Sequence, residues 1–535
     1  MGIEFVFESG TYHFYPDYAV EKTLYISNHD EDVPKRIAFD FSGWRKVKIR
    51  GEGAVFLFHT DILPFHLDRC QEILIEGITI DYERTGYSEG EIVELSGKRM
   101  VLRIDRKEYP YRVFHGELYF EEEGAYHPLY YGCLEMDRRR NAPVYQGRDI
   151  SFNRPYPSSY GAVFREAGEN LVEVTLTEDQ QFPETSREGN RMILRHHLRT
   201  HPCFYITRSE GITLRDITIY HCTGMAVISQ FTKDITIERV CLVRHPQKDR
   251  IFTATADGFH FVYAGGKIHI KNCVLENQLD DPVNIHGIYG RIHKVTSKRE
   301  VIVELVEGMQ KGVLLGTAGD YFAVIDNRTM LEQEHAVITE ITWMNSDYQR
   351  IVFAEDMENL IPGFVVENQS WVPDVLIEGC TFRNNRARGL LLTSAGDVLV
   401  RDNTFETPGA AILIEGDSNY WFESGATRHI VIEGNRFHQC AYVSAWGKAP
   451  IQVSPSALVW EKDRRYHQYL EVRGNVFQCC DDRLVNAVNL KKLVFLDNKI
   501  ERTTVFEPIK GQALELDGVL EVETDINKQS GDMSR

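Results

Sequence analysis

Three aspartates in this chain of 535 residues have a spacing that could do chemistry. Asp257 is followed by Asp280 after 23 residues and by Asp281 after 24. Crowded carboxylates repel one another, so at least one should hold a proton at neutral pH and supply a general acid beside general bases. Cleavage of a glycosidic bond requires this combination, with roughly 6.5–9.5 Å between acid and base in an inverting enzyme. The trio therefore predicts a glycoside hydrolase with Asp280 as the general acid and with Asp257 and Asp281 as the water-activating pair.

A recurring strand pattern supplies the elements that must position these aspartates. Alternating apolar residues that close on a small or amide residue, as in 73–80, return many times along the chain. Equivalent positions of later copies follow one another at 23 residues, or at 23 plus an insertion: Ile217, Val240, Cys273, Cys380, Asn403, Asn435, Asn475 and Asn498. Strands rich in β-branched residues, with Asn or Gly corners, differ from the Leu-x-x-Leu-x-Leu signature of leucine-rich repeats. We predict an all-β fold, a right-handed parallel β-helix with coils of about 23 residues and two inserted small antiparallel β-barrel-like modules.

Asparagine recurs at one corner of the later coils, at Asn403, Asn435, Asn475 and Asn498. Because Asn tolerates left-handed backbone angles, it suits a bend between two strands of a coil. We expect these side chains to form a stacked ladder inside the β-helix.

Two stretches break the period and divide the chain. Both contain alternating segments typical of antiparallel strands. The predicted units are N-terminal coils at 1–85, a first inserted module at 86–195, coils with the aspartates at 196–287, a second module at 288–371, C-terminal coils at 372–510, and an acidic tail at 511–535 that we expect to be disordered.

The strand register predicts how the aspartates lie. If the apolar residues after each of them point inward, Asp257 and Asp281 are neighbours on adjacent coils, at roughly the 4.8 Å separation of paired strands. Asp280 can join them only if the chain bends there, and Pro282 is consistent with a strand that begins at this point. A second aspartate pair, Asp481-Asp482, has no third carboxylate one coil away at a matching offset, so capping of backbone amides accounts for it.

Further side chains are predicted to bind the substrate. The next coil places Arg388 level with Asp281, where a cation could keep a base ionised or grip sugar hydroxyls. Trp421 lies on a long excursion and could stack on the apolar face of a sugar, with core packing as the alternative. The full predicted set is His260, Asn284, His286, Arg386, Arg388, Glu415, Trp421 and Glu423.

Four segments together resemble glycoside hydrolase family 110, the exo-acting α-1,3-galactosidases. They are 255–258, 280–287, 384–389 and 420–425, and the resemblance covers roughly residues 30 to 500. It implies an inverting, metal-independent enzyme without a cofactor that removes terminal α-1,3-linked galactose from an oligosaccharide or glycan. The three aspartates match the catalytic trio proposed for that family. Polygalacturonases have a similar trio, but their Gly-His-Gly is absent here, because Ile285 precedes His286-Gly287.

Composition excludes several classes of partner. A net charge of -19 opposes sequence-independent attraction to nucleic acid or anionic lipid, and no run of 18 apolar residues suggests a membrane span. The chain start has no signal-peptide pattern, which predicts a cytoplasmic protein, or a secreted one whose leader has been removed. The ten cysteines are expected to be buried free thiols. The oligomeric state, including a homodimer, stays open.

Two other functions fit a β-helix with clustered carboxylates. A lyase or epimerase for acidic polysaccharides could hold calcium on the trio. A non-catalytic solenoid could bind glycans. The acidic chain, with few basic residues predicted around the cluster, argues against a polyanionic substrate.

Overall fold

The computed structural model describes residues 2–122, 124–155, 159–177 and 179–526. Within them the regular elements are β-strands, apart from the short 3-10 helices η1 (Pro16–Tyr18) and η2 (Gly308–Gln310). No helix among these residues is long and apolar enough to cross a membrane. The predicted all-β fold is confirmed.

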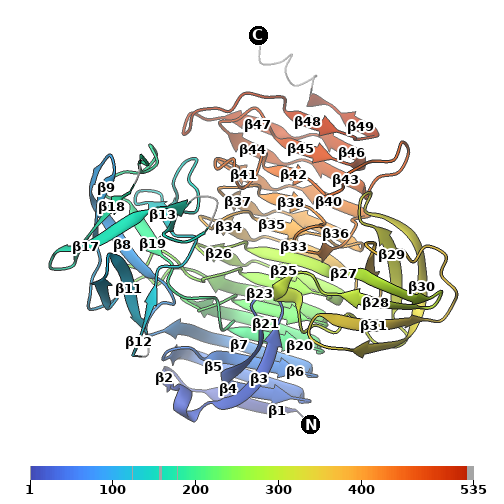
Figure 1. Cartoon of the computed structure of the whole chain (residues 1–535), viewed down its shortest axis with the longest axis horizontal. Coiled ribbons are helices and arrows are strands. Elements are labelled where there is room, and N and C mark those ends of the chain that lie inside the picture. Colours follow the sequence, from blue (N-terminus) through green and yellow to red (C-terminus); the bar gives the residue numbers. More distant parts are fainter. Residues whose placement is uncertain (1, 123, 156–158, 178, 527–535) are drawn as a thin grey trace.

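Parallel strands stack coil upon coil in two long sheets (Figure 1). The first sheet has 19 strands, because each coil contributes a strand and many add a second beyond a bend. Its main strands are β1 (Ile3–Phe7), β5 (Arg45–Phe58), β7 (Gln71–Tyr82), β21 (Glu210–Ile219), β23 (Lys233–Leu242), β25 (Gly265–Lys271), β33 (Pro373–Glu378), β36 (Asp397–Arg401), β40 (His429–Glu433), β43 (His467–Arg473), β46 (Leu490–Leu496) and β49 (Glu521–Thr524). Beyond the bend lie β2 (Gly10–Phe14), β26 (Val274–Glu276), β34 (Thr381–Arg383), β37 (Thr404–Glu406), β41 (Arg436–His438), β44 (Val476–Cys479) and β47 (Lys499–Arg502).

The second sheet has the aspartates just before two of its strands, β24 and β27. Its parallel strands are β4 (Asp30–Ser42), β6 (Leu63–Asp68), β20 (Phe204–Thr207), β22 (Val227–Gln230), β24 (Phe259–Val262), β27 (Val283–Ser297), β35 (Leu390–Leu392), β38 (Ile412–Ile414), β42 (Ile451–Val453), β45 (Val485–Val488) and β48 (Leu514–Asp517). At the N-terminal end β3 (Val20–Ile26) pairs antiparallel with β4. Alternate residues of both sheets point into one continuous apolar core, which is the reason that coils stack at all.

The corner asparagines form the predicted ladder. The side-chain amide of Asn403 donates to Asn435 at 3.0 Å, that of Asn435 to Asn475 at 3.0 Å, and that of Asn475 to Asn498 at 2.9 Å. The left-handed backbone angle, however, belongs to the residue before each asparagine, as at Asp402 (φ 55°) and Gly434 (φ 65°). The asparagines are therefore selected for their buried hydrogen bonds and not for a strained backbone.

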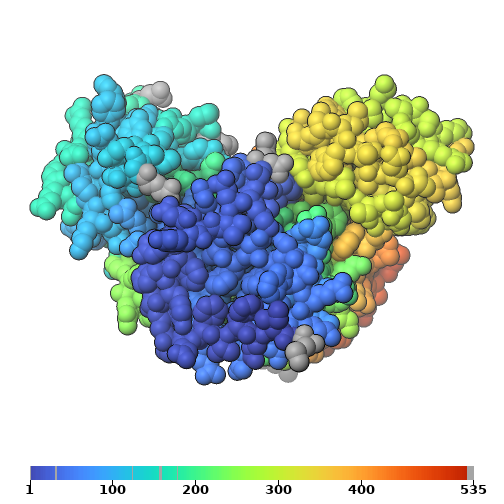
Figure 2. Space-filling model, turned by 90° about the horizontal axis from the view of Figure 1, so that it is seen from below, coloured from blue at the N-terminus to red at the C-terminus, as the bar shows by residue number. Residues whose placement is uncertain are grey.

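Two antiparallel modules stand on either side of the β-helix and give the molecule a V-shaped outline (Figure 2). The first orders its strands as β14 (Ala142–Pro143), β13 (Leu134–Asp137), β19 (Arg191–Leu194), β8 (Ser88–Ser96), β9 (Arg99–Arg103), β18 (Leu171–Leu176) and β17 (Ala162–Gly168). It also has a sheet of β10 (Tyr111–Phe114), β11 (Glu117–Glu122) and β12 (Ala125–Pro128), and the pair β15 (Ser151–Phe152) and β16 (Ser159–Tyr160). The module encloses an apolar core of its own.

The second module is a closed barrel. Pairing runs from β27 through β28 (Glu300–Glu304), β31 (Tyr348–Phe353), β30 (Leu331–Trp343), β29 (Tyr321–Asp326) and β32 (Val365–Asn368) back to β27. Strand β27 thus begins as a β-helix strand and continues into the barrel wall. One rigid segment joins the coil that holds Asp280 and Asp281 to this module.

The C-terminal segment corrects one expectation. Strands β48 and β49 extend both sheets by another coil, so disorder from residue 511 was wrong for 514–524. Leu514 and Leu516 pack against the core of the β-helix, which the acidic composition of the tail obscured. The part of the predicted tail at 527–535 lies outside the described residues. All ten cysteines are free thiols, and nine are buried, as expected.

Candidate active site

A hollow lies at the start of β24 and β27, and it contains all three aspartates. Six of the predicted substrate-binding side chains also line it: His260, Asn284, Arg388, Glu415, Trp421 and Glu423. The remaining two, His286 and Arg386, support the lining from behind. The structure therefore brings the three aspartates and most of the predicted lining together in one hollow.

Asp257 and Asp281 occupy equivalent places on adjacent coils, as predicted. Phe259 pairs with Val283, and the backbone amides of Gly258 and Phe259 donate to the carbonyls of Asp281 and Pro282, each at 2.8 Å. A side chain at Gly258 would bring its Cβ to 2.5 Å from the Pro282 carbonyl oxygen. Glycine therefore lets the two coils approach where the carboxyl groups lie.

Asp281 is held by Arg388 from the next coil, again as predicted from register. The guanidinium places Nη2 2.6 Å from Oδ2 and Nε 3.2 Å from Oδ1, and the backbone amide of Arg388 donates to Oδ1 at 2.9 Å. The Asp281 side chain is only 2% exposed. Burial raises its pKa to about 6, although Arg388 counteracts part of the rise.

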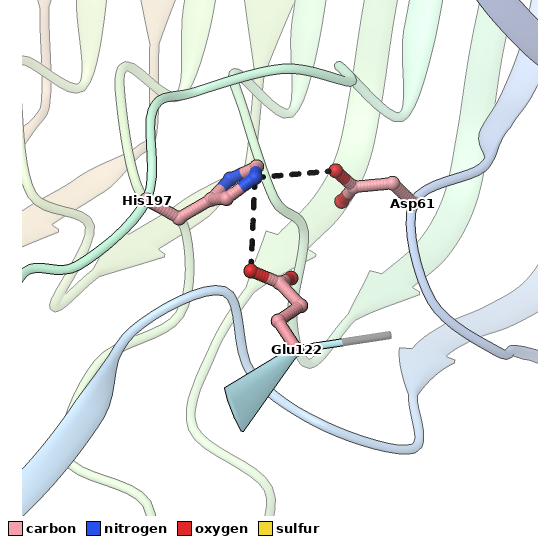
Figure 3. Close-up of side chains that lie close together, drawn as sticks. All are labelled: Asp61, Glu122 and His197. Atoms are coloured by element: carbon pink, nitrogen blue, oxygen red, sulfur yellow. Dashed lines mark ion pairs between the residues drawn. The ribbon is translucent and has the colours of Figure 1, made fainter. Parts of the chain in front are cut away.

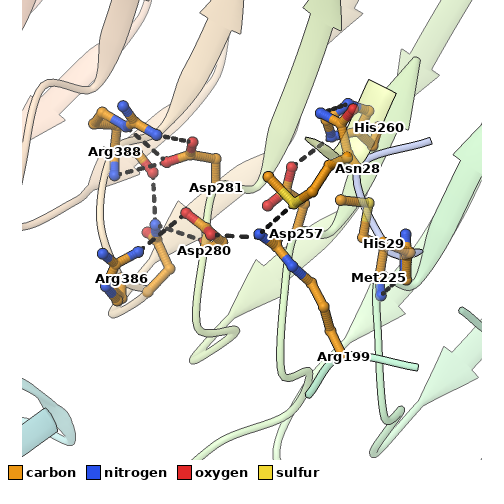
Figure 4. A network of polar contacts seen from close by, with 12 residues as sticks. Asn28, His29, Arg199, Met225, Asp257, His260, Asp280, Asp281, Arg386 and Arg388 are labelled. Atoms are coloured by element: carbon orange, nitrogen blue, oxygen red, sulfur yellow. Dashed lines mark hydrogen bonds and ion pairs between the residues drawn. The ribbon is translucent and has the colours of Figure 1, made fainter. Parts of the chain in front are cut away.

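Asp280 has a different electrostatic environment (Figure 4). Arg386 Nη1 lies 3.2 Å from its Oδ1, and Arg199 Nη1 lies 3.7 Å from its Oδ2. Burial disfavours the charged carboxylate, but Arg386 and Arg199 outweigh it and hold the pKa of Asp280 below its ordinary value. Asp280 is thus ionised in the free protein, whereas the sequence argument placed the proton there.

Arg386 was predicted to contact substrate, and in the free protein it contacts two carboxylates. Its Nη2 lies 2.6 Å from Oδ2 of Asp149, a buried residue of the first module, and its Nη1 faces Asp280. The arginine therefore links the module to the aspartate cluster and stabilises the charge of Asp280.

Two histidines determine where the proton of the cluster lies. His286 donates from Nδ1 to the Gly287 carbonyl at 2.7 Å, since a carbonyl oxygen can only accept. Burial lowers the pKa of His286 and that of His260, the latter to about 3, so each ring is neutral and carries one proton. Nε2 of His286 therefore accepts from Nε2 of His260, 2.8 Å away.

Nδ1 of His260 is then an acceptor, and its partner is Oδ2 of Asp257 at 2.6 Å. With this tautomer of His260, Asp257 donates and is the protonated member of the trio. Burial, followed by the charge of Asp280, raises the pKa of Asp257 to about 8, in agreement with this hydrogen-bond chain. His260 and His286 are 1% and 2% exposed with both ring nitrogens engaged, so they orient Asp257, and their contact with substrate stays a prediction.

The rim offers groups suited to a sugar. Trp421 is 42% exposed, which excludes core packing, and its loop is anchored by Asp417, whose carboxylate accepts from the backbone amides of Tyr420 and Trp421. Oδ1 of the buried Asn284 lacks a hydrogen-bond partner among the described residues and can accept from a hydroxyl. Burial raises the pKa of Glu415 and of Glu423.

Five residues that line the hollow were not predicted from the sequence: Asn28, Arg199, Met225, Met309 and Leu391. Met309 belongs to η2 of the second module, whereas Arg199 lies on the segment that follows the first module, so only the second module lines the hollow directly among the described residues. The expectation of few basic residues near the cluster is wrong, because Arg195, Arg199, Arg386 and Arg388 all lower the pKa of Asp280. A run of histidine and arginine at 195–201, where the chain returns to the coils, was the available signal.

The same contacts bear on the calcium alternative. Asp281 is bound by Arg388, Asp280 faces Arg386 and Arg199, and Asp257 is bound to His260. These positive and hydrogen-bonding groups already occupy the directions from which carboxylates bind a hard cation. The arrangement suits proton transfer better than calcium binding.

Comparisons with known proteins agree with this architecture. A family model described as GLAA-B beta-barrel domain I matches residues 88–191, and one described as right handed beta helix region matches residues 362–507. The chain is 28% identical over 541 residues to alpha-1,3-galactosidase B of Bacteroides thetaiotaomicron, spanning 99% of this chain and 86% of that protein. It is 27% identical over 518 residues to alpha-1,3-galactosidase A of Shewanella woodyi, spanning 95% and 83%. The similarity runs through the coils and both modules, and the right-handed β-helix prediction is confirmed.

Proposed function

We propose that this chain, which is related along nearly its whole length to alpha-1,3-galactosidases, is an exo-acting inverting α-1,3-galactosidase. The observation that carries the proposal is a hollow whose three carboxyl groups differ in pKa, with that of Asp257 raised and that of Asp280 lowered. A protonated Asp257 beside an ionised Asp280 provides the acid and base forms that glycosidic cleavage needs.

Asp280 delivers the proton to the leaving oxygen in this proposal. Its side chain is 22% exposed, against 5% for Asp257 and 2% for Asp281, so it can reach the glycosidic bond. A bound sugar removes water from Asp280 and raises its pKa, so the proton held by Asp257 passes to it. Asp257 thereby becomes a carboxylate.

Water completes the reaction from the opposite side of the sugar ring. Asp281, fixed by Arg388, and the newly ionised Asp257 orient and deprotonate the water that attacks the anomeric carbon. The proton released by water returns to Asp257, and the proton from Asp280 leaves on the new hydroxyl of the departing sugar. The trio ends with the charges that it had before substrate bound.

An exo mode of attack fits the enclosure of the site. Asn28, Arg199 and, from the second module, Met309 close around the hollow, which favours a terminal sugar over one within a chain. The exposed Trp421 at the rim can stack on the apolar face of that ring.

Hydrolysis of α-1,3-galactobiose tests the proposal. Proton NMR of the first product should show β-galactose before mutarotation. Release of α-galactose would contradict inversion, and an unsaturated product that absorbs ultraviolet light would indicate a lyase. Failure to cleave this disaccharide, with cleavage of other α-galactosides, would remove the linkage assignment alone.

A further inference from the structure

Three side chains from distant parts of the sequence converge outside the aspartate cluster (Figure 3). Asp61 lies between β5 and β6, Glu122 ends β11 of the first module, and His197 follows β19. Nε2 of His197 lies 3.7 Å from Oδ2 of Asp61 and 3.6 Å from Oε2 of Glu122. Both distances exceed a hydrogen bond, so hydrogen bonding from the imidazole does not explain why these atoms meet.

The position of the proton on His197 leaves the close approach of these three atoms unexplained. Its Nδ1 lies 2.7 Å from the carbonyl oxygen of Leu198, so Nδ1 carries the proton and donates it. In the neutral ring Nε2 then presents a lone pair to two carboxylate oxygens. Three electron-rich atoms facing one another repel unless a cation lies among them.

We propose that Asp61, Glu122 and His197 bind a divalent transition metal ion of the zinc class. Imidazole nitrogen and carboxylate oxygen are zinc ligands at 2.0–2.2 Å, which puts neighbouring ligand atoms of a tetrahedral site roughly 3.3 Å apart. The two separations from Nε2 of His197 exceed this by only a few tenths of an ångström, and all three ligand atoms lie within 4.8 Å of one another. Water fills the fourth position.

The surroundings of the triad have the features of a metal site. The Nδ1 hydrogen bond of His197 to a carbonyl is the arrangement that orients metal-bound histidines. Thr200 Oγ1 donates to Oδ2 of Asp61 at 2.9 Å, which fixes that carboxylate, while Oδ1 of Asp61 is buried without a hydrogen-bond partner among the described residues. His201 lies beside the same carboxylate, with Nδ1 3.8 Å from Oδ2.

The location gives the metal a structural task. Asp61 belongs to the coils and Glu122 to the first module, so one ion would fasten the two together. His197 is two residues before Arg199, which faces Asp280 at 3.7 Å. The ion would therefore also hold the segment that brings this arginine to the aspartate cluster, without touching the substrate.

Metal content and thermal unfolding test the proposal on the full chain. Protein purified without chelator should contain about one zinc per chain by elemental analysis. After chelator treatment, zinc chloride should raise Tm by several degrees, since a ligand that binds only the folded state stabilises it. Neither readout depends on galactosidase activity, so the outcome is separate from that of the proposed function.

Matched variants locate the ion. Asp61→Asn and His197→Gln should lose both the bound zinc and the rise in Tm, whereas His429→Gln, which changes an exposed histidine elsewhere, should keep both. Retention of zinc in His197→Gln would overturn the assignment. Absence of zinc in the purified protein, together with no shift in Tm on adding zinc chloride, would show that a proton on His197 supplies the cation instead.

Discussion

Asp257 donates the proton of its carboxyl group to Nδ1 of His260 across 2.6 Å. The direction of this bond is dictated several atoms away, at the Gly287 carbonyl, which obliges His286 to accept from His260. A neutral carboxyl group is thus built into the coil before substrate arrives. The pH behaviour of the protein should report this proton.

Activity should follow a bell-shaped pH profile. Asp257 must hold its proton in the free enzyme, and burial with the charge of Asp280 raises its pKa to about 8, so kcat/KM should fall above pH 8. Asp281 must be ionised, and burial raises its pKa to about 6, so kcat/KM should fall below pH 6. Initial rates on a chromogenic α-galactoside at low substrate concentration measure both limbs. A flat profile from pH 5 to 9 would contradict the shared-proton mechanism.

Stability should also depend on the Asp257 proton. Because the pKa in the folded state is raised to about 8 from an ordinary 3.8, the folded form holds a proton that the unfolded form releases. The stabilisation is complete below about pH 4, declines as pH rises, and is lost above pH 8. Asp257→Asn keeps a donor for His260 and cannot ionise, so its Tm should fall less than that of the wild type between pH 5 and 9. Equal losses of Tm would show that Asp257 is ionised in the folded protein.

Asp280→Asn should affect substrates unequally. General acid catalysis contributes about 10²–10⁴-fold when the leaving group needs a proton. We expect a loss of that size in kcat on galactobiose and a much smaller loss on a nitrophenyl galactoside, whose leaving group departs without help. Asp481→Asn, at the second aspartate pair, is the control and should leave both rates unchanged. An equal loss of kcat on both substrates would show that Asp280 is not the general acid.

Arg388→Met should damage both folding and catalysis. It leaves Asp281 buried without its cation, and breaking a buried ion pair in this way costs about 3 kcal/mol of unfolding free energy. Urea denaturation measures the loss, and the acid limb of the pH profile should move upward because Asp281 binds a proton more tightly. The double variant Arg388→Met/Asp281→Asn should regain most of the stability but not the activity. Failure to regain stability would mean that Arg388 acts mainly through other contacts.

Asn435→Ala should destabilise the β-helix without touching the site. It deprives the Val400 carbonyl and the Asn403 amide of buried partners, and each unsatisfied group costs about 1–3 kcal/mol. Chemical denaturation should show a loss of about 3 kcal/mol in unfolding free energy. Thr404→Ala, at a half-buried position beside the ladder, should change it little. A loss below about 1 kcal/mol would show that water or a neighbour replaces the amide.

The periodic part of the molecule could be predicted because its physics is local. Strands of alternating residues and a coil of about 23 residues fix which side chains become neighbours, so the pairings of Asp281 with Arg388 and of Asn403 with Asn435 followed from counting. The last coil was not predicted, because only Leu514 and Leu516 indicate its inner face within an acidic segment.

Contacts between segments separated by an inserted module could not be predicted from the coil length. Arg199 reaches Asp280 only after the chain has passed through the first module, and Asn28 reaches His260 from the N-terminal coils, 3.1 Å from its Nε2. Alternation correctly set His260 and His286 apart from the core, but it gave no sign that loops from elsewhere would cover them. Their burial indicates that both histidines orient Asp257.

Strand β27 has a consequence for how such a protein can change. Its first residues flank the aspartates, and its later residues form one strand of the second barrel. No linker separates the two parts. The barrel is therefore not an independent domain that could be exchanged as a unit. Exchange of this module between relatives, in nature or by engineering, would have to preserve the pitch of one continuous strand, or else displace His286 and the proton that it governs.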